Sequence, residues 1–139
     1  MCRYALKPYK RHYACFQCRK AFKRARADKP ARCPQCRLLM VDMGLDFAPP
    51  KMSDLKAWKA AAALYEVGET FHSCGCRGPG YRPRDPAKLA SFFRDRLRVY
   101  RGELAGWTRD EAPARAQTRK EALAYWRARI AALERALVD

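Results

Sequence analysis

Two pairs of cysteines in this chain have the same internal spacing. Cys15 and Cys18 are separated by two residues, Cys33 and Cys36 are separated by two residues, and fourteen residues lie between the pairs. A turn of this length directs two thiolates to one point, and two such turns close a tetrahedral shell around one metal ion. The two-plus-two spacing is more typical of zinc than of an iron–sulfur cluster. We therefore expect one Zn²⁺ bound by these four thiolates.

Other chemistry for these thiols is less favoured by the surrounding sequence. A redox dithiol of the thioredoxin type is expected near a βαβ pattern, and none surrounds these two matched pairs. Seven cysteines in one chain indicate metal ligands where thiols are kept reduced. The basic N-terminus has no apolar segment typical of a secretory signal, and no apolar run is long enough for a transmembrane helix. We expect a cytoplasmic protein.

A second group of metal-ligating residues lies in the middle of the chain. His72, Cys74 and Cys76 occupy alternate positions and would face one side of an extended strand. Cys2 is a possible fourth ligand. A second metal site, a reduced and partly buried pair of thiols, and a reactive or redox role remain open. An open zinc site would imply hydrolysis, but the carboxylate nearest in sequence, Glu69, has no evident placement as a general base.

The charge of the chain is strongly and unevenly positive. Thirty lysines and arginines face 14 acidic residues, and residues 1–50 hold twelve of the basic and three of the acidic groups. Such an excess attracts polyanions, and the absence of a lipidation signal favours nucleic acid over a membrane. The candidate nucleic-acid contacts are Lys7, Lys10, Arg11, Arg19, Lys20, Lys23, Arg24, Arg26 and Arg32 around the cysteines, and Tyr81, Arg82 and Arg84 in a loop rich in glycine and proline.

Aromatic residues, including Tyr13, Phe16 and Phe22, alternate with these cations. Recognition of RNA combines cations on phosphates with rings against bases. Phe16 and Phe22 are nevertheless expected to cover the metal site. The alternative is a charged surface that serves solubility alone.

Short strands on both sides of the first cysteine pair, at residues 12–14 and 20–23, would position the ligands. A helix over residues 54–67 follows, with Ser53 as its cap and Gly68 as its stop. Leu55, Trp58, Ala62 and Tyr65 recur on one face of this helix, as the printed sequence shows.

Two more helices are expected in the second half of the chain. Asp85 followed by Pro86 opens a helix to about residue 101, and its apolar face comprises Leu89, Phe92 or Phe93, Leu97 and Tyr100. After a break at residues 102–107, Thr108 and Glu111 form a capping box for the last helix. The narrow apolar seam of that helix comprises Leu123, Trp126, Ile130, Leu133 and Leu137. This seam either packs within the chain or docks on a protein partner.

These elements predict an α+β fold, with a small zinc ribbon of short antiparallel strands followed by a few α-helices, including a long C-terminal helix. We divide the chain into a basic zinc ribbon at 1–50, a helix–loop–helix section with the His/Cys cluster at 51–107, and the C-terminal helix at 108–139. Prolines at 49 and 50 mark the first of these boundaries.

The segments YACFQCRKAFK (13–23) and RCPQCRLLMVDMG (32–44) resemble the zinc-ribbon family over residues 12–47. In such ribbons each turn that carries a cysteine pair is called a knuckle, and Arg37 stands where they usually have a glycine after the second knuckle. Zinc ribbons recur in ribosomal proteins, transcription factors and enzymes. Taken as a whole, the chain resembles the small zinc-ribbon accessory proteins of certain bacterial ribosomes.

We therefore expect a non-enzymatic RNA-binding protein that contacts rRNA and neighbouring ribosomal proteins. One alternative is a DNA-binding or transcription-associated zinc ribbon, although the chain has no asparagine and no evident helix-turn-helix for base readout. A second alternative is a metalloenzyme that uses His72, Cys74 and Cys76.

Overall fold

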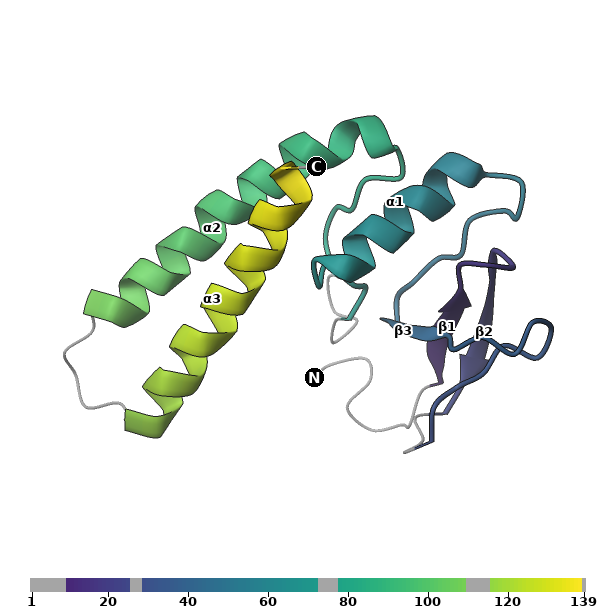
Figure 1. Cartoon of the computed structure of the whole chain (residues 1–139), viewed down its shortest axis with the longest axis horizontal. Coiled ribbons are helices and arrows are strands. Elements are labelled where there is room, and N and C mark those ends of the chain that lie inside the picture. The colour runs from purple at the N-terminus through teal and green to yellow at the C-terminus, as the bar shows by residue number, and fades with distance from the viewer. Residues whose placement is uncertain (1–9, 26–28, 73–77, 110–115, 139) are drawn as a thin grey trace.

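The computed structural model of the chain describes residues 10–25, 29–72, 78–109 and 116–138. Across these residues a three-stranded antiparallel sheet is followed by three α-helices, the last of them long (Figure 1). The predicted α+β class and the predicted element order are confirmed. In the described part of the chain, each helix is too short or too polar to cross a membrane.

The strand β1 (Arg11–Cys15) lies in the middle of the sheet, between β2 (Lys20–Arg24) and β3 (Val41–Gly44). Tyr13 pairs with Phe22 on β2 and with Asp42 on β3. The first two strands are those that the sequence predicts. The third has little strand signal of its own because it is only four residues long, and burial of Met43 against the rest of the core holds it in place.

The segment after the first helix closes the outer edge of β3. The backbone N–H of Phe71 donates to the carbonyl of Met43 at 2.8 Å, and the N–H of Asp46 donates to the carbonyl of Phe71 at 3.1 Å. Gly44 has a φ of +99°, and a Cβ at this position would lie 2.5 Å from the carbonyl carbon of Phe71. This contact requires a glycine, both for the positive φ and for the close approach of the two backbones.

The first helix, α1 (Leu55–Glu66), is capped by Asp54 rather than by Ser53. The Asp54 carboxylate accepts a hydrogen bond from the N–H of Ala57 at 3.1 Å, which satisfies a donor that the first turn leaves free. Gly68 follows the helix with a φ of +80°, as predicted for its stop.

The buried face of α1 differs from the predicted one. Its buried residues are Ala57, Trp58, Ala60, Ala61 and Leu64, whereas Leu55 and Tyr65, predicted on the apolar face, are 59 % and 40 % exposed. The alanines decide the orientation, because small side chains let the helix approach its neighbours closely. Of the predicted face, only Trp58 is fully buried.

The second helical segment begins with a short 3₁₀ turn, η1 (Pro86–Lys88), and continues as α2 (Leu89–Arg109). Asp85 caps this segment as predicted, accepting from the N–H of Ala87 at 3.0 Å. The predicted apolar face is also confirmed, since the buried residues of α2 are Leu89, Phe93, Leu97 and Tyr100.

The predicted break at residues 102–107 is wrong, because α2 continues through Gly102 and Gly106 to Arg109. Thr108 lies inside α2, where its hydroxyl donates to the carbonyl of Leu104 at 2.8 Å, so it does not cap the last helix. Glu111 lies outside the described residues. A glycine inside a helix costs about 1 kcal/mol. Leu104, between the two glycines, packs against the core that α2 shares with α3 and offsets part of that cost.

The last helix, α3 (Ala116–Val138), packs against α2 in an antiparallel hairpin (Figure 1). Ile130 and Leu133 of the predicted seam are buried in this hairpin, and Trp126 and Leu137 pack against them. An ion pair of 3.2 Å between Arg101 and Glu134 also joins the two helices. The seam therefore packs within the chain.

Helix α1 lies between the sheet and the hairpin (Figure 1) and contributes to the core on both sides. Trp58 and Ala61 pack with Ala14 and Met43 of the sheet. Ala60 and Leu64 pack with the apolar faces of α2 and α3. The position of the ribbon is thereby set by a helix that is itself held by the hairpin.

Candidate metal centre and cationic face

The Sγ atoms of Cys15, Cys18, Cys33 and Cys36 all lie within 4.8 Å of one another. The sulfurs of Cys15 and Cys36 are 3.5 Å apart, and those of Cys18 and Cys33 are 3.9 Å apart. A tetrahedral zinc ion with Zn–S bonds of about 2.3 Å requires sulfurs about 3.8 Å apart. The four cysteines can therefore hold one metal ion with little rearrangement.

Each cysteine pair lies on a tight turn whose backbone points toward sulfur. The N–H of Cys18 donates to the Sγ of Cys15, and the N–H of Gln35 donates to the Sγ of Cys33, each at 3.4 Å. The second turn is closed by a 2.9 Å hydrogen bond from the N–H of Arg37 to the carbonyl of Cys33. Such N–H groups stabilise thiolates and orient them toward a common point.

The residue after each pair adopts the left-handed backbone conformation. Arg19 has a φ of +54° and Arg37 a φ of +68°, and they are the two described non-glycine residues with positive φ. At both positions an arginine therefore occupies a backbone conformation that favours glycine. Because a side chain in this conformation costs about 1 kcal/mol or more, the rest of the knuckle must hold it there.

The surroundings of the thiols give them different acidities. Backbone N–H groups of Cys36 and Gln35 lower the pKa of Cys33 to about 6. Burial and the neighbouring thiols raise the pKa of Cys18 to about 12, and burial raises that of Cys15. Four thiols this close do not all ionise by themselves, so binding of a cation would release protons and join the two turns.

The predicted aromatic cover of the site is present in part. Phe22 packs against the cysteine cluster, together with Tyr13 and Met40. Phe16 lies on the other side, with its ring centroid 6.2 Å from that of Trp58 on α1. Phe16 therefore joins the ribbon to the helix instead of covering the sulfurs.

The predicted cations of the ribbon divide into two groups. Arg11 forms an ion pair of 2.7 Å with Asp42, Arg19 donates to the carbonyl of Met52 at 2.9 Å, and Lys20 donates to Gln35 at 2.6 Å. These three are half-buried and brace the ribbon. The remaining described cations of the ribbon prediction are exposed to solvent, namely Lys10, Lys23, Arg24 and Arg32. Lys7 and Arg26 lie outside the described residues.

The register of the sheet places charges and rings on one face. Arg11 pairs with Arg24 and Tyr13 pairs with Phe22, and paired residues share a side of the sheet. Ala14 and Ala21 point to the opposite side, into the core beside α1. The side of β1 and β2 that faces away from α1 thus combines arginines with half-buried aromatic rings. Lys23 pairs with His12 and lies on the same side as Ala14 and Ala21, so the exposed cations of β2 are on both sides of its end.

The predicted contacts in the glycine- and proline-rich loop lie in different environments. Tyr81 is 66 % exposed, with its ring 6.1 Å from that of Phe92, and Arg84 is also exposed. The side chain of Arg82 is only 9 % exposed and pairs with Glu69 at 3.4 Å. Arg82 thus faces the protein interior.

The second group of candidate ligands is described only at His72. Its Nε2 lies 3.9 Å from the carboxylate of Asp42. Cys2, Cys74 and Cys76 lie outside the described residues, so the predicted second metal site remains a prediction. In the part of the chain that the structure describes, the one metal-ligating cluster found is that of the four ribbon cysteines.

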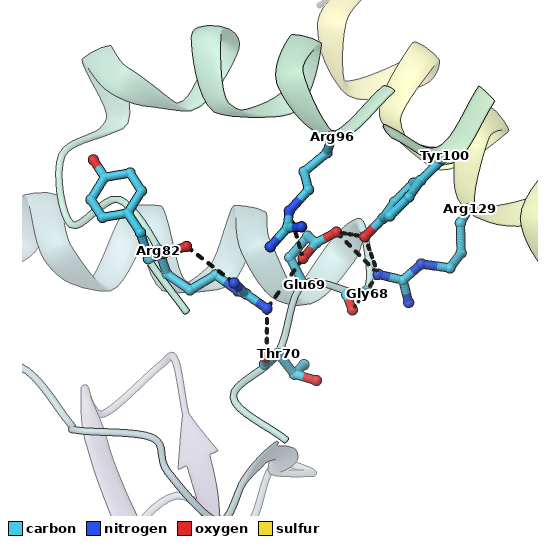
Figure 2. Close-up of polar contacts among 8 residues, drawn as sticks. Gly68, Glu69, Thr70, Arg82, Arg96, Tyr100 and Arg129 are labelled. Carbon is cyan, nitrogen blue, oxygen red and sulfur yellow. Dashed lines mark hydrogen bonds and ion pairs between the residues drawn. The ribbon is translucent and has the colours of Figure 1, made fainter. Parts of the chain in front are cut away.

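Sequence reasoning missed the role of Glu69. This residue is 2 % exposed and lies among Arg82, Arg96 and Arg129, with the hydroxyl of Tyr100 donating to its carboxylate (Figure 2). A carboxylate directly after a helix-stopping glycine does not indicate such a cluster, because its partners lie up to 60 residues away.

Comparison with models of protein families, with curated proteins and with solved structures finds no match to this chain.

Proposed function

We propose that this chain is a non-enzymatic zinc-ribbon protein that binds RNA, and that it works on the ribosome in contact with rRNA and neighbouring ribosomal proteins. Two of the four metal ligands lie at the turn that joins the two strands with the exposed cations, and this is the observation that carries the proposal. Cys15 ends β1 and the turn at Cys18 leads into β2, which carries Lys23 and Arg24 exposed to solvent.

A metal ion in the cysteine cluster would set the spacing of these cations before RNA arrives. Less conformational entropy is then lost on binding, because the strands are already ordered. Four thiolates also complete a tetrahedral zinc shell and leave no open position for a substrate or an activated water. This shell supports a structural role for the metal and a binding role for the protein.

RNA is favoured over DNA as the polyanion. Direct reading of DNA bases needs a helix that enters the major groove, whereas α2 and α3 pack along each other and α1 lies between the hairpin and the sheet. A cationic sheet with adjacent rings is better suited to folded or single-stranded RNA.

The test is the salt dependence of RNA binding by the zinc-loaded chain. Lys10, Lys23 and Arg24 are the exposed cations at the end of β1 and β2 that lies away from the cysteines, and we call them the ribbon surface. Substituting glutamine at all three should weaken binding at every salt concentration and reduce the slope of log K against log salt by about 2 to 3, roughly one for each lost phosphate contact. The matched control substitutes glutamine at three exposed arginines of the hairpin, Arg94, Arg127 and Arg135. This control variant removes the same number of charges and should retain most of the slope of log K against log salt.

Equal losses in the two triple variants would show that net charge alone attracts RNA, and the ribbon surface would lose its role. Competition by duplex DNA as strong as that by RNA would favour the transcription-associated alternative. Sedimentation of cell lysate should place the chain with ribosomal subunits. Metal analysis should give one zinc ion per chain, whereas a second ion would support the metalloenzyme alternative.

A further inference from the structure

The cluster around Glu69 joins four separate segments of the chain (Figure 2). Arg129 of α3 lies 3.1 Å from the Glu69 carboxylate, Arg82 of the loop lies 3.4 Å from it, and Arg96 of α2 lies 3.5 Å from it. Arg129 also donates to the hydroxyl of Tyr100 at 2.8 Å and to the carbonyl of Gly68 at 3.1 Å.

Positive charge exceeds negative charge in this cluster. Three guanidinium groups surround one carboxylate, and guanidinium stays charged at any physiological pH. Burial lowers the pKa of Arg82, and its neighbours Arg96 and Arg129 lower it further, while Glu69 raises it. Two positive charges thus remain unbalanced beside a buried carboxylate, which is costly unless solvent or an anion compensates them.

The cluster also has more hydrogen-bond donors than acceptors. Each guanidinium has five N–H donors, while a carboxylate accepts at about four positions. The Nε atoms of Arg82, Arg96 and Arg129 are all buried and have no hydrogen-bond partner among the described residues. A buried donor without a partner costs about 1 to 3 kcal/mol. The Nε of Arg96 lies 3.5 Å from the Glu69 carboxylate, so the Nε atoms of Arg82 and Arg129 are the ones that point most clearly to missing acceptors.

A cavity of about 350 Å³ opens on this cluster. All three arginines and Glu69 line it, together with His72 and other polar or aromatic residues, among them Thr70, Tyr100 and Tyr125. The side chains of Arg96 and Arg129 are 29 % and 21 % exposed, so part of each remains accessible to a ligand. The side chain of Arg82 is 9 % exposed and is held in place by its ion pair with Glu69.

We propose that this cavity binds the phosphate group of a small ligand, or free phosphate. A phosphate dianion matches the two unbalanced positive charges, and its tetrahedral oxygens accept from guanidinium groups that arrive from different elements. A carboxylate would neutralise only one of the two charges. The site is separate from the ribbon surface, so it does not depend on the proposed RNA contact.

The test measures binding of inorganic phosphate to the zinc-loaded full chain by calorimetry at constant ionic strength, with acetate as the comparison anion. Saturable binding of phosphate in the millimolar range or tighter, with acetate much weaker, is expected. Arg96→Gln should weaken phosphate binding about tenfold or more, as expected for one charge-assisted contact. The control Arg98→Gln removes an exposed arginine of the same helix, paired with Asp95 outside the cavity, and should bind phosphate like the unmodified chain.

Arg96→Lys keeps the charge at this position and serves if Arg96→Gln does not fold, which circular dichroism would show. It should bind phosphate with intermediate affinity, because an ammonium cannot reproduce the guanidinium fork. The affinity for adenosine monophosphate, measured in the same way, distinguishes a nucleotide site from a site for phosphate alone. Tighter binding than that of inorganic phosphate assigns the site to nucleotides, and equal binding assigns it to the phosphate group alone. Absence of saturable phosphate binding, or equal binding by Arg96→Gln, would overturn the proposal.

Discussion

Replacing Glu69 with glutamine should destabilise the fold more than a typical substitution does. The amide keeps the shape of the side chain and can still accept from Tyr100, but it removes the one negative charge that the described residues place among Arg82, Arg96 and Arg129. Loss of one partner from a fully buried ion pair costs about 3 to 5 kcal/mol. Because Arg96 and Arg129 are 29 % and 21 % exposed, water screens part of the repulsion, and we expect a loss of about 3 kcal/mol, the low end of that range.

A loss of this size is a large part of the roughly 5 to 15 kcal/mol that stabilises a typical domain. Urea unfolding in zinc-saturated, phosphate-free buffer, followed by far-UV circular dichroism, measures it as a shift in midpoint at constant slope. Glu66→Gln is the matched control, because Glu66 is an exposed acid at the end of α1 and should change stability by about 0.5 kcal/mol at most. If the free energies of unfolding of Glu69→Gln and Glu66→Gln differ by less than about 1 kcal/mol, the three arginines do not need the Glu69 carboxylate, and this reasoning is refuted.

Two further predictions concern the knuckles. Chelation of the metal should disorder the ribbon, because the short segment buries too little apolar surface to keep four thiols together without an ion. Trp58, whose ring packs 6.2 Å from Phe16 of the first knuckle, should report this as a change in fluorescence; an identical spectrum before and after chelation would contradict it. Arg37→Gly should raise the free energy of unfolding by about 1 kcal/mol, since it relieves a positive φ. The same change at Arg24, in the regular strand β2, should lower it, and a gain at both positions would show that φ is not the cause.

Local chemistry explains which features could be predicted from the sequence. Each cysteine pair needs only a turn of a few residues to bring its own two sulfurs together, and the matched spacing of the two pairs predicts that all four meet at one ion, as their distances within 4.8 Å bear out. The cap at Asp85 and the stop at Gly68 are likewise decided within one helical turn. The strands at the first knuckle follow from the turn that joins them.

Features that depend on distant partners could not be predicted in the same way. The prediction for the buried face of α1 is wrong because a row of alanines gives little amphipathic signal, and the choice between faces is made by the sheet and the hairpin. The helix break expected near Gly102 is absent because α3 packs along α2 and stabilises it past both glycines.

The sequence by itself determined that four thiols would meet in a strongly cationic segment, because ligand spacing and charge are properties of neighbouring residues. Only the tertiary structure decided that three arginines from a loop and two helices would enclose Glu69 beside a polar cavity. Charge–charge contacts carry no signal along the chain when their partners lie far apart in it. They arise when packing of apolar faces brings those segments together, and that packing is what places a surplus of positive charge at this junction.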